Sequence, residues 1–411
     1  MAAGTYTENV TISHSLTLNG AQVGVDARSP RGSESIINGG AAANITITAD
    51  NVTVDGFTLN GPSSSGTAAV VMQTANTGET IQNNIINNPG RAASITTSNT
   101  AFRKNLVNNT ATASDGFQAN TNPISGLTIA DNTFGGADPN VYNADITVIE
   151  GNANVVVSGN ASNGDGTLIA LFKTNGAQIT GNTVVGAGFS AIYIGGANTN
   201  VTVTGNQVSA ASSAVKVADA FADGVNGSVT VTGNTLQNNS YGVYVTALSV
   251  TSASTVVVNQ NNLTGNTLFG INNEATGTLN GTCNWWGAGN GPGPVGPGTG
   301  DKVSTNVTFT PWLIAPAPGG ACTGPNTPTP TPAPTPTPTP APTPTPVPTA
   351  TPVSTPNPTP CASCPVGGLV DVLSAGSGGS TGTPFLAVLA MLIALTAVCG
   401  TGIYAFARRR S

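Results

Sequence analysis

Apolar and polar residues alternate in short segments along the first three quarters of the chain. The run VTVT at residues 201–204 alternates valine with threonine, and the same run returns at residues 229–232. A period of two belongs to a β-strand, and the β-branched residues that dominate these segments favour strands. No stretch between Thr5 and Leu313 carries the apolar stripe of an amphipathic helix. The pattern therefore predicts an all-β domain built from short strands.

The strand segments recur as copies of one phrase, which runs each time into a short polar turn. Examples are LTIADNTF from Leu127, AQITGNTV from Ala177 and VTVTGNTL from Val229. Asparagine tolerates left-handed backbone angles and is therefore a common turn residue. The recurring asparagines are Asn84, Asn105, Asn132, Asn160, Asn182, Asn206, Asn234 and Asn261.

The spacing of these asparagines, 21 to 28 residues, indicates a solenoid in which each repeat buries its apolar face against its neighbours. A repeat of this length with short strands and no helix is one coil of a parallel β-helix. The asparagines should then stack from coil to coil as a hydrogen-bonded ladder. A β-sandwich is the alternative, but its hairpin signals would recur every 8–12 residues or so.

Longer segments around the strands carry a second signal. They include NTVVGAGFSAIYIGG from Asn182 and NTLQNNSYGVYVTALS from Asn234, with AGTYTENVTI from Ala3 at the start and CNWWGAGNGPGPV from Cys283 near the end. These segments resemble the coils, opening and closing segments of the pectate-lyase-like superfamily. The resemblance implies a single-stranded right-handed parallel β-helix over residues 1–318. It implies no particular chemistry, because this fold hosts lyases, hydrolases, esterases, adhesins and structural shafts.

An enzyme on this fold would need clustered carboxylates, which hold calcium in lyases or act directly in hydrolases, with a lysine or arginine base in lyases. The acidic stretch from residue 115 to 165 is the candidate region. Its candidate catalytic residues are Asp115, Asp138, Asp145, Glu150, Asp165 and Lys173.

Some of these charges have a plainer use. Counted from the ladder asparagines, Lys104 and Asp131 occupy equivalent positions on consecutive coils, and so do Asp145 and Lys173. Both pairs are expected to stack as surface ion pairs. The Asn-Thr-Asp, Asp-Asp and Gly-His-Gly motifs of polygalacturonases are absent from the sequence, as are the later motifs of pectin methylesterases. These observations favour a role without catalysis.

Cysteine and tryptophan gather in the closing segment. Cys283 and Cys322 bracket it, and we expect a disulfide between them rather than two free thiols. Trp285, Trp286 and Trp312 lie in or next to the same segment. The resemblance favours a plug that closes the C-terminal end of the core, while a platform on which sugars stack is the alternative.

The remaining chain predicts a stalk and a membrane anchor. Residues 325–360 are almost entirely Thr-Pro and would extend as polyproline II over about 110 Å. Residues 385–407 form an uncharged apolar run that is long enough to cross a bilayer as one helix. Three arginines follow this run and place the C-terminus in the cytoplasm, with the β-helix outside. An export signal is absent from the first residues, so we expect further residues upstream of Met1.

The chain thus divides into five parts. They are a β-helix at 1–318, a Thr/Pro-rich extended linker at 319–360, a Cys/Gly/Ser-rich spacer at 361–384, a transmembrane helix at 385–407 and a basic tail at 408–411.

Composition narrows the function further. Charged residues make up only 7% of the chain and the net charge is −6, so nucleic acid is not an expected partner. We expect a non-catalytic, single-pass cell-surface protein for adhesion, carbohydrate binding or envelope structure, with extracellular carbohydrate or another cell as its partner. No cofactor is expected. The alternative is a calcium-dependent lyase, or a hydrolase, acting on uronic-acid polymers.

Overall fold

The computed structural model describes residues 1–62, 67–73, 76–87, 89–108, 115–119, 123–135, 144–219 and 221–323. The linker beyond residue 323, the spacer, the transmembrane helix and the basic tail that the sequence predicts lie outside these residues. Within them, no helix has the length and apolar character that a bilayer crossing requires.

Short parallel strands form three sheets, A, B and C, and successive strands from β1 to β33 enter A, B and C in turn. Sheet A contains, in spatial order, β1 (Gly4–Tyr6), β4 (Ser35–Asn38), β7 (Phe57–Asn60), β10 (Ile85–Asn87), β13 (Leu106–Asn108), β16 (Thr133–Gly135), β19 (Ala161–Asn163), β22 (Thr183–Val185), β25 (Gln207–Ser209), β28 (Thr235–Gln237) and β31 (Asn262–Thr264).

Sheet B is the sheet with the longest row of strands. It contains β2 (Val10–Ile12), β5 (Ile45–Ile47), β8 (Ala68–Met72), β11 (Arg91–Ile95), β14 (Asp115–Ala119), β17 (Ala144–Val148), β20 (Thr167–Leu171), β23 (Ser190–Ile194), β26 (Ser213–Val217), β29 (Tyr241–Val245), β32 (Phe269–Asn273), β35 (Gly300–Val303) and β34 (Pro292–Pro294).

Sheet C completes each coil, and one 3-10 helix, η1 (Ala253–Thr255), precedes its strand β30. The sheet contains β3 (Thr17–Asn19), β6 (Thr53–Asp55), β9 (Thr80–Gln82), β12 (Ala101–Arg103), β15 (Thr128–Ala130), β18 (Ala153–Ser158), β21 (Asn175–Thr180), β24 (Val201–Thr204), β27 (Val229–Thr232), β30 (Val256–Asn259), β33 (Leu279–Asn280) and β36 (Val307–Thr308).

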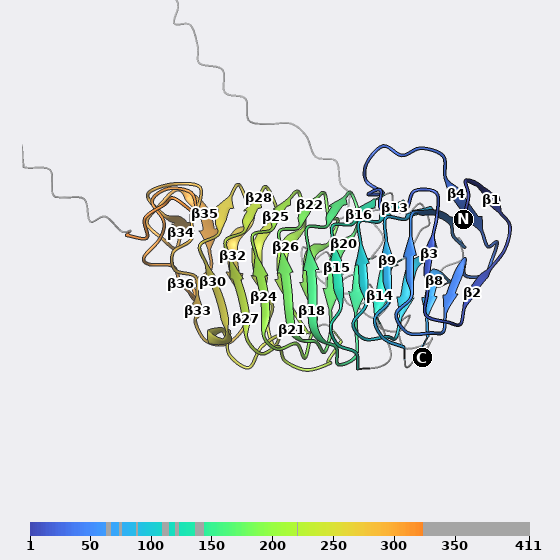
Figure 1. Ribbon diagram of the computed structural model, residues 1–411. Helices are drawn as coiled ribbons and strands as arrows, with labels where there is room; N and C mark the ends of the chain where they lie inside the picture. Colours follow the sequence, from blue (N-terminus) through green and yellow to red (C-terminus); the bar gives the residue numbers. More distant parts are fainter. Residues whose placement is uncertain are drawn as a thin grey trace, which may run out of the picture. The chain divides into compact units, whose positions relative to one another are not determined.

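This topology is a parallel β-helix of the right-handed type, as the sequence predicts. From β1 to β33 each coil contributes one strand to each sheet, and each strand pairs with the equivalent strands of the coils before and after it (Figure 1). In the closing segment β34 and β35 both join sheet B and pair with each other. Parallel pairs cannot be joined by a tight hairpin, so the chain has to pass through the other two sheets before it returns.

The alternating pattern of the strands becomes the alternation between core and surface. In sheet C the middle residues of successive strands lie in register and are completely buried; they are Val54, Ile81, Phe102, Ile129, Val157, Ile179, Val203, Val231 and Val258. The flanking Thr202 and Thr230 point outward and are partly exposed. Burying one such aliphatic or aromatic side chain stabilises the fold by about 1.5–3 kcal/mol.

The turn between sheets C and A contains the asparagine ladder. Each side-chain Nδ2 donates to the Oδ1 of the next asparagine, at 2.9–3.2 Å, from Asn84 through to Asn284. The residue before each ladder asparagine has a positive φ. Glycine takes this position in several coils, as Gly181 does, but Lys104 and Asp131 also adopt it, at φ 54° and 55°.

Two further ladders lie at the other corners of the coil, and the sequence reasoning missed them. Asn198 Nδ2 donates to Asn226 Oδ1 at 2.9 Å between sheets B and C. Between sheets A and B, Asn239 donates to Asn266 at 3.0 Å, and Asn266 donates to the carboxylate of Asp301 at 2.6 Å. The ladder amides at all three corners are therefore hydrogen-bonded from coil to coil, as buried polar groups usually are.

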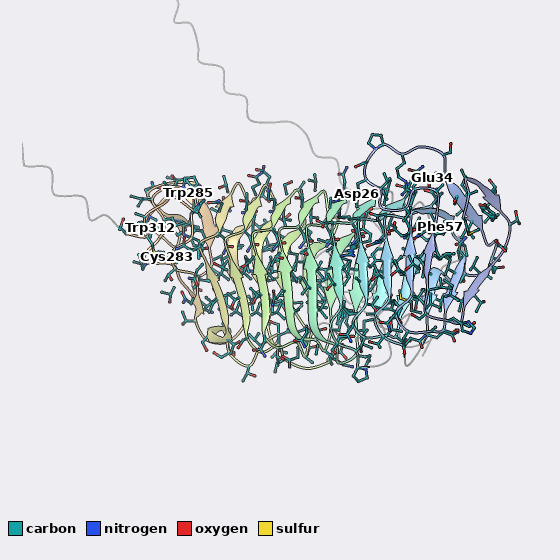
Figure 2. All side chains as sticks on the ribbon, in the orientation of Figure 1. Asp26, Glu34, Phe57, Cys283, Trp285 and Trp312 are labelled. Carbon is teal, nitrogen blue, oxygen red and sulfur yellow. A yellow bond between two sulfur atoms is a disulfide. The ribbon has the colours of Figure 1, made fainter. Side chains whose placement is uncertain are left out.

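The C-terminal end is closed by the segment that the sequence singled out. Cys283 and Cys322 form a disulfide. Trp286 is completely buried and Trp312 is 3% exposed, so both pack into the core, whereas Trp285 is partly exposed. Figure 2 labels Cys283, Trp285 and Trp312 together at this end.

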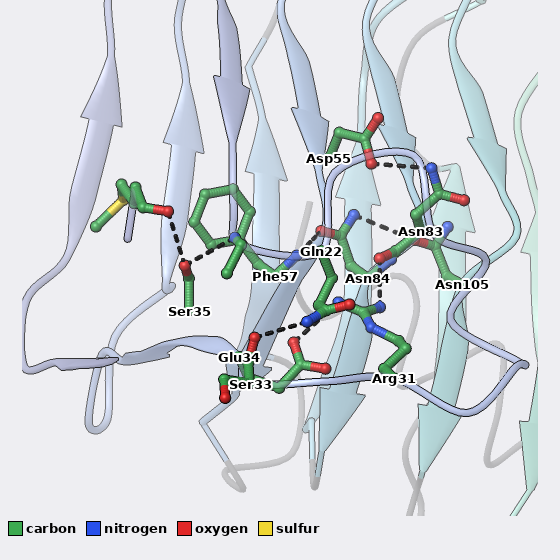
Figure 3. A network of polar contacts seen from close by, with 12 residues as sticks. Gln22, Arg31, Ser33, Glu34, Ser35, Asp55, Phe57, Asn83, Asn84 and Asn105 are labelled. Carbon is green, nitrogen blue, oxygen red and sulfur yellow. Dashed lines mark hydrogen bonds and ion pairs between the residues drawn. The ribbon is translucent and has the colours of Figure 1, made fainter. Parts of the chain in front are cut away.

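Near the N-terminus, residues 20–34 form a strap along the corner between sheets C and A (Figure 3). Gly24 N–H donates to Asp55 Oδ1 at 3.0 Å, Arg31 donates to the Asn83 carbonyl at 2.6 Å, and Ala27 N–H donates to the Lys104 carbonyl at 3.3 Å. The strap therefore fastens three consecutive coils.

Candidate functional site

The predicted acidic stretch does not gather into one site within the described residues. Asp138 lies outside them, and the structure describes the backbone of Asp115 on β14 but not its side chain. Asp145, on β17, is 4% exposed and accepts a hydrogen bond from Ser162 Oγ at 2.5 Å. Ser162 stands in register with Phe134 and Val184, both core residues, so Asp145 faces inward. Asp165 is 1% exposed in the turn before β20.

Glu150 and Lys173 lie at a different corner, just after β17 and β20. The Lys173 ammonium contacts Glu150 at 3.2 Å and Asp223 at 3.1 Å. The expected stacking of Asp145 on Lys173 was wrong, because the strand register sets Asp145 across from Leu168. Equal counting from the ladder asparagine fails here because the loops before the two strands differ in length.

Lys104 and Asp131 lie on adjacent coils, just after the paired strands β12 and β15, but the predicted ion pair between them is not among the ion pairs of the described residues. Their charges also act on the strap. The Arg28 guanidinium, with Lys104 adding to it, lowers the pKa of the Asp26 carboxyl, and Asp26 with Asp131 raises the pKa of Arg28. Lys104 and Asp131 therefore interact with the strap at the corner between sheets C and A.

The described residues contain no group of three or more histidine, cysteine or acidic side chains placed to hold a metal ion.

A different set of side chains converges on the outer face of sheet B, and we call it the aromatic patch. Its members are Lys216, Tyr241, Tyr244, Phe269, Asn272 and Glu274. Lys216, Tyr244 and Asn272 face one another across β26, β29 and β32, and Tyr241 stands in register with Phe269. The residues on either side of Lys216 and Tyr244 point into the core, so strand alternation places these two outside.

The aromatic rings of the patch form a stacked platform. The ring centroids of Tyr241 and Tyr244 are 4.6 Å apart with an interplanar angle of 16°. Tyr241 and Phe269 stack at 6.2 Å and 8°. The three side chains are partly exposed, so the platform remains open to a ligand. Flat, rigid rings with a polar edge suit ligands that have both an apolar face and hydroxyl groups.

Two charges flank the platform. Lys216 Nζ lies 5.4 Å from the centre of the Tyr244 ring, within the range of a cation–π interaction. Burial lowers the pKa of the Lys216 ammonium, and the nearby Glu274 opposes this effect. On the other side, the Glu274 carboxylate accepts hydrogen bonds from Tyr244 Oη at 2.7 Å and Asn272 Nδ2 at 3.1 Å.

These contacts keep Tyr244 protonated. Burial raises the pKa of its hydroxyl, and the hydrogen bond to Glu274 raises it further. Tyr244 is therefore a stable donor that fixes the carboxylate beside the platform. Glu274 itself is exposed, so its carboxylate oxygens can accept further hydrogen bonds from a ligand.

The sequence held a signal for this patch that was not used. Lys216, Tyr244 and Asn272 are spaced by one repeat each, as are Tyr241 and Phe269. In a solenoid, residues separated by one repeat become neighbours on one face. Counting aromatic residues by repeat, rather than acidic residues along the chain, would have pointed to this face.

No family model matches the sequence, and no curated protein matches it. Among solved structures, the chain is similar to the A-module of the Azotobacter vinelandii mannuronan C-5 epimerase AlgE6, at 15% identity over 68% of this chain and 86% of that chain, with a TM-score of 0.42. It is also similar to the pectate lyase Pel9A, at 11% identity over 75% of this chain and 69% of that chain, with a TM-score of 0.32. Likeness at this level assigns no activity.

Proposed function

We propose that this protein is a non-catalytic, cell-surface β-helix that binds carbohydrate through the aromatic patch. The stacked rings of Tyr241, Tyr244 and Phe269 carry the proposal. The apolar face of a sugar ring packs on such a platform, while Lys216 and Glu274 supply a donor and an acceptor for hydroxyl groups at its edges.

The geometry of the coils favours a polymer as the ligand. Adjacent strands of a sheet lie about 4.8 Å apart, close to the length of one pyranose unit in an extended chain. A polysaccharide that lies across the strands therefore places successive sugars over β26, β29 and β32. The Thr/Pro linker at 319–360 and the span at 385–407, both inferred from sequence, belong to this proposal as the stalk and anchor that hold the patch away from the membrane.

The proposal is tested by glycan-array and calorimetric binding with the full chain in detergent. Tyr244→Ala removes a stacked ring and the donor to Glu274, and we expect a loss of affinity of about two- to twelvefold, since an aromatic pair contributes about 0.5–1.5 kcal/mol beyond its buried area. Tyr6→Ala, on β1 at the far end, is the matched control and should bind as the unchanged protein does. Equal affinity of the two variants for every glycan bound would refute this site.

One observation favours a second function, β-elimination in uronic-acid polymers. Burial lowers the pKa of Lys216, and a lysine adjusted in this way can serve as the base that removes a proton next to a carboxylate. The assay is incubation with pectate, pectin and alginate, with and without calcium, while the absorbance of unsaturated product is followed. Product that forms with the unchanged protein and is lost in Lys216→Met would establish the lyase; binding without product supports the binding protein.

A further inference from the structure

The Lys173 side chain lies between two carboxylates that come from different parts of the chain. Its Nζ is 3.1 Å from Asp223 Oδ1 and 3.2 Å from Glu150 Oε1. Glu150 and Lys173 follow β17 and β20 on neighbouring coils, whereas Asp223 belongs to residues 218–228, the loop between β26 and β27. The Asp223 side chain is 2% exposed, so one carboxylate of the three-residue group is almost completely removed from water.

A small apolar cluster lies beside this group, while the side chains of Lys173 and Glu150 remain 26% and 41% exposed. Phe172, next to Lys173, packs against Phe221 with ring centroids 5.5 Å apart and against Tyr193 at 5.9 Å. Ala144, Ile149, Ala170 and Ala218 complete the cluster, which is separate from the main core. The cluster lowers the local dielectric around Asp223 and limits the access of water.

The loop holds Asp223 in place by its own hydrogen bonds. Asp219 Oδ1 accepts from the Asp223 N–H at 2.9 Å, and the Gly224 carbonyl accepts from the Ala197 N–H at 2.7 Å. The carboxylate of Asp223 is therefore presented to Lys173 by a fixed backbone.

The backbone at this corner adopts unfavourable angles. Glu150 has φ 73°, Lys173 has φ 51° and Ala222, in the loop, has φ 55°. A non-glycine residue in the left-handed region costs about 1 kcal/mol or more. The same left-handed angles recur at other turns of the solenoid, as at Lys104 and Asp131, so here they fix the direction of the turn rather than mark a reaction site.

We propose that Lys173 and Asp223 react with each other to form an intramolecular isopeptide bond, with Glu150 as the general acid and base. A lysine, an acidic residue and a second carboxylate within hydrogen-bond distance, beside a cluster of aromatic rings, are the groups that this condensation needs.

The reaction is balanced within the chain. Proton transfer across the ion pair makes the Lys173 amine neutral and protonates Asp223. The nitrogen lone pair attacks Cγ of Asp223 and forms the C–N bond. Glu150 takes a proton from the nitrogen of the tetrahedral intermediate and delivers it to the departing hydroxyl. The C–O bond breaks, one water leaves, and Glu150 ends in its starting state. No oxidant or other reactant takes part.

The bond would tie the loop at 218–228 to a coil two turns away. Each coil of a solenoid contacts only its neighbours, so a covalent tie across coils opposes stepwise unwinding. A protein displayed outside the cell, as proposed above, is exposed to mechanical load and to proteases that cleave unwound coils. A covalent bond keeps the coils together under these conditions, whereas an ion pair separates. The proposed cross-link does not depend on the proposed carbohydrate binding, and each is tested by its own experiment.

The test is the intact mass of the purified, reduced full chain. We expect a mass lower by one water than the sequence mass, and a tryptic digest in which trypsin fails to cleave after Lys173 and the peptides of Lys173 and Asp223 remain joined. Lys173→Arg, which keeps the charge, should show its full sequence mass. Asp223→Asn should lose ammonia in place of water, and Lys104→Arg, the matched control, should still lose one water.

Glu150→Gln separates the catalytic role from a structural one. We expect the folded variant to retain its full mass, or to lose water at least a hundredfold more slowly. The ion pair between Lys173 and Asp223 remains in this variant. An unchanged protein that has its full sequence mass, and separate tryptic peptides for the two residues, overturns the proposal whatever the variants do.

Discussion

The asparagine ladder between sheets C and A offers the sharpest test of what stabilises the β-helix, and Asn182 stands in its middle. This side chain is completely buried and forms four hydrogen bonds to neighbouring coils. Its Oδ1 accepts from the N–H and the Nδ2 of Asn160, at 2.9 and 3.0 Å. Its Nδ2 donates to the Val157 carbonyl at 3.0 Å and to Asn206 Oδ1 at 2.9 Å.

Asn182→Ala removes all four bonds and leaves their partners buried. At about 1 kcal/mol for each lost bond, we expect a loss of about 4 kcal/mol in the free energy of unfolding. In a domain of roughly 320 residues, with an unfolding entropy of about 2.1 cal/mol/K per residue, such a loss lowers the melting temperature by about 6 °C. Asn182→Asp should be at least as destabilising at neutral pH, because it replaces a donor with a buried charge.

The assay is thermal unfolding followed by circular dichroism, with urea unfolding as a second measure. Thr183→Ala is the matched control, since Thr183 is the next residue and its side chain is exposed. It should change stability by about 0.5 kcal/mol or less. If Asn182→Ala unfolds within about 1 kcal/mol of this control, the ladder does not stabilise the coils and the reasoning is refuted.

Two further predictions follow from single residues. Burial raises the pKa of Glu79, so its contribution to stability is complete below its ordinary pKa and is lost as the pH rises through the raised value; Glu79→Gln should remove this loss in melting curves between acidic and neutral pH. Gly181 has φ 63° with open space where a Cβ would lie, so Gly181→Ala should cost about 1–2 kcal/mol in urea unfolding from backbone strain alone.

Each has its own control. A Glu79→Gln profile parallel to that of the unchanged protein would show that another group causes the pH dependence. Gly135 also has open space around its Cβ direction but no positive φ, so Gly135→Ala should leave stability unchanged or raise it slightly. Equal effects of the two glycine substitutions would contradict the strain argument.

The sequence predicts the parts of the fold that depend on local pattern. Val201 and Val203 alternate with threonine because only one face of each strand meets the core. The core is apolar in every coil, so the same alternation recurs along the chain. The ladder asparagines recur for the same reason, because each coil needs the same turn at the same corner. Fold class and ladder could therefore be predicted from one chain.

The candidate site could not be predicted in the same way, and the reason is loop length. The coils are 21 to 28 residues long because their loops differ in length, while their strands stay in register. Counting the same number of residues from each ladder asparagine therefore paired Lys173 with Asp145 instead of Glu150. Asp223 contacts Lys173 although the strands that precede the two residues, β26 and β20, lie two coils apart.

The sequence by itself thus determined the period, the strands, the buried aliphatic face and the asparagine ladder of this protein, because each of these repeats and depends on neighbours close in the chain. The tertiary structure alone decided that Asp145 faces the core, that Lys173 lies between two carboxylates, and that Tyr241, Tyr244 and Phe269 stack on one face. Contacts between coils depend on the length and packing of every loop between them, and a short sequence pattern does not contain that information.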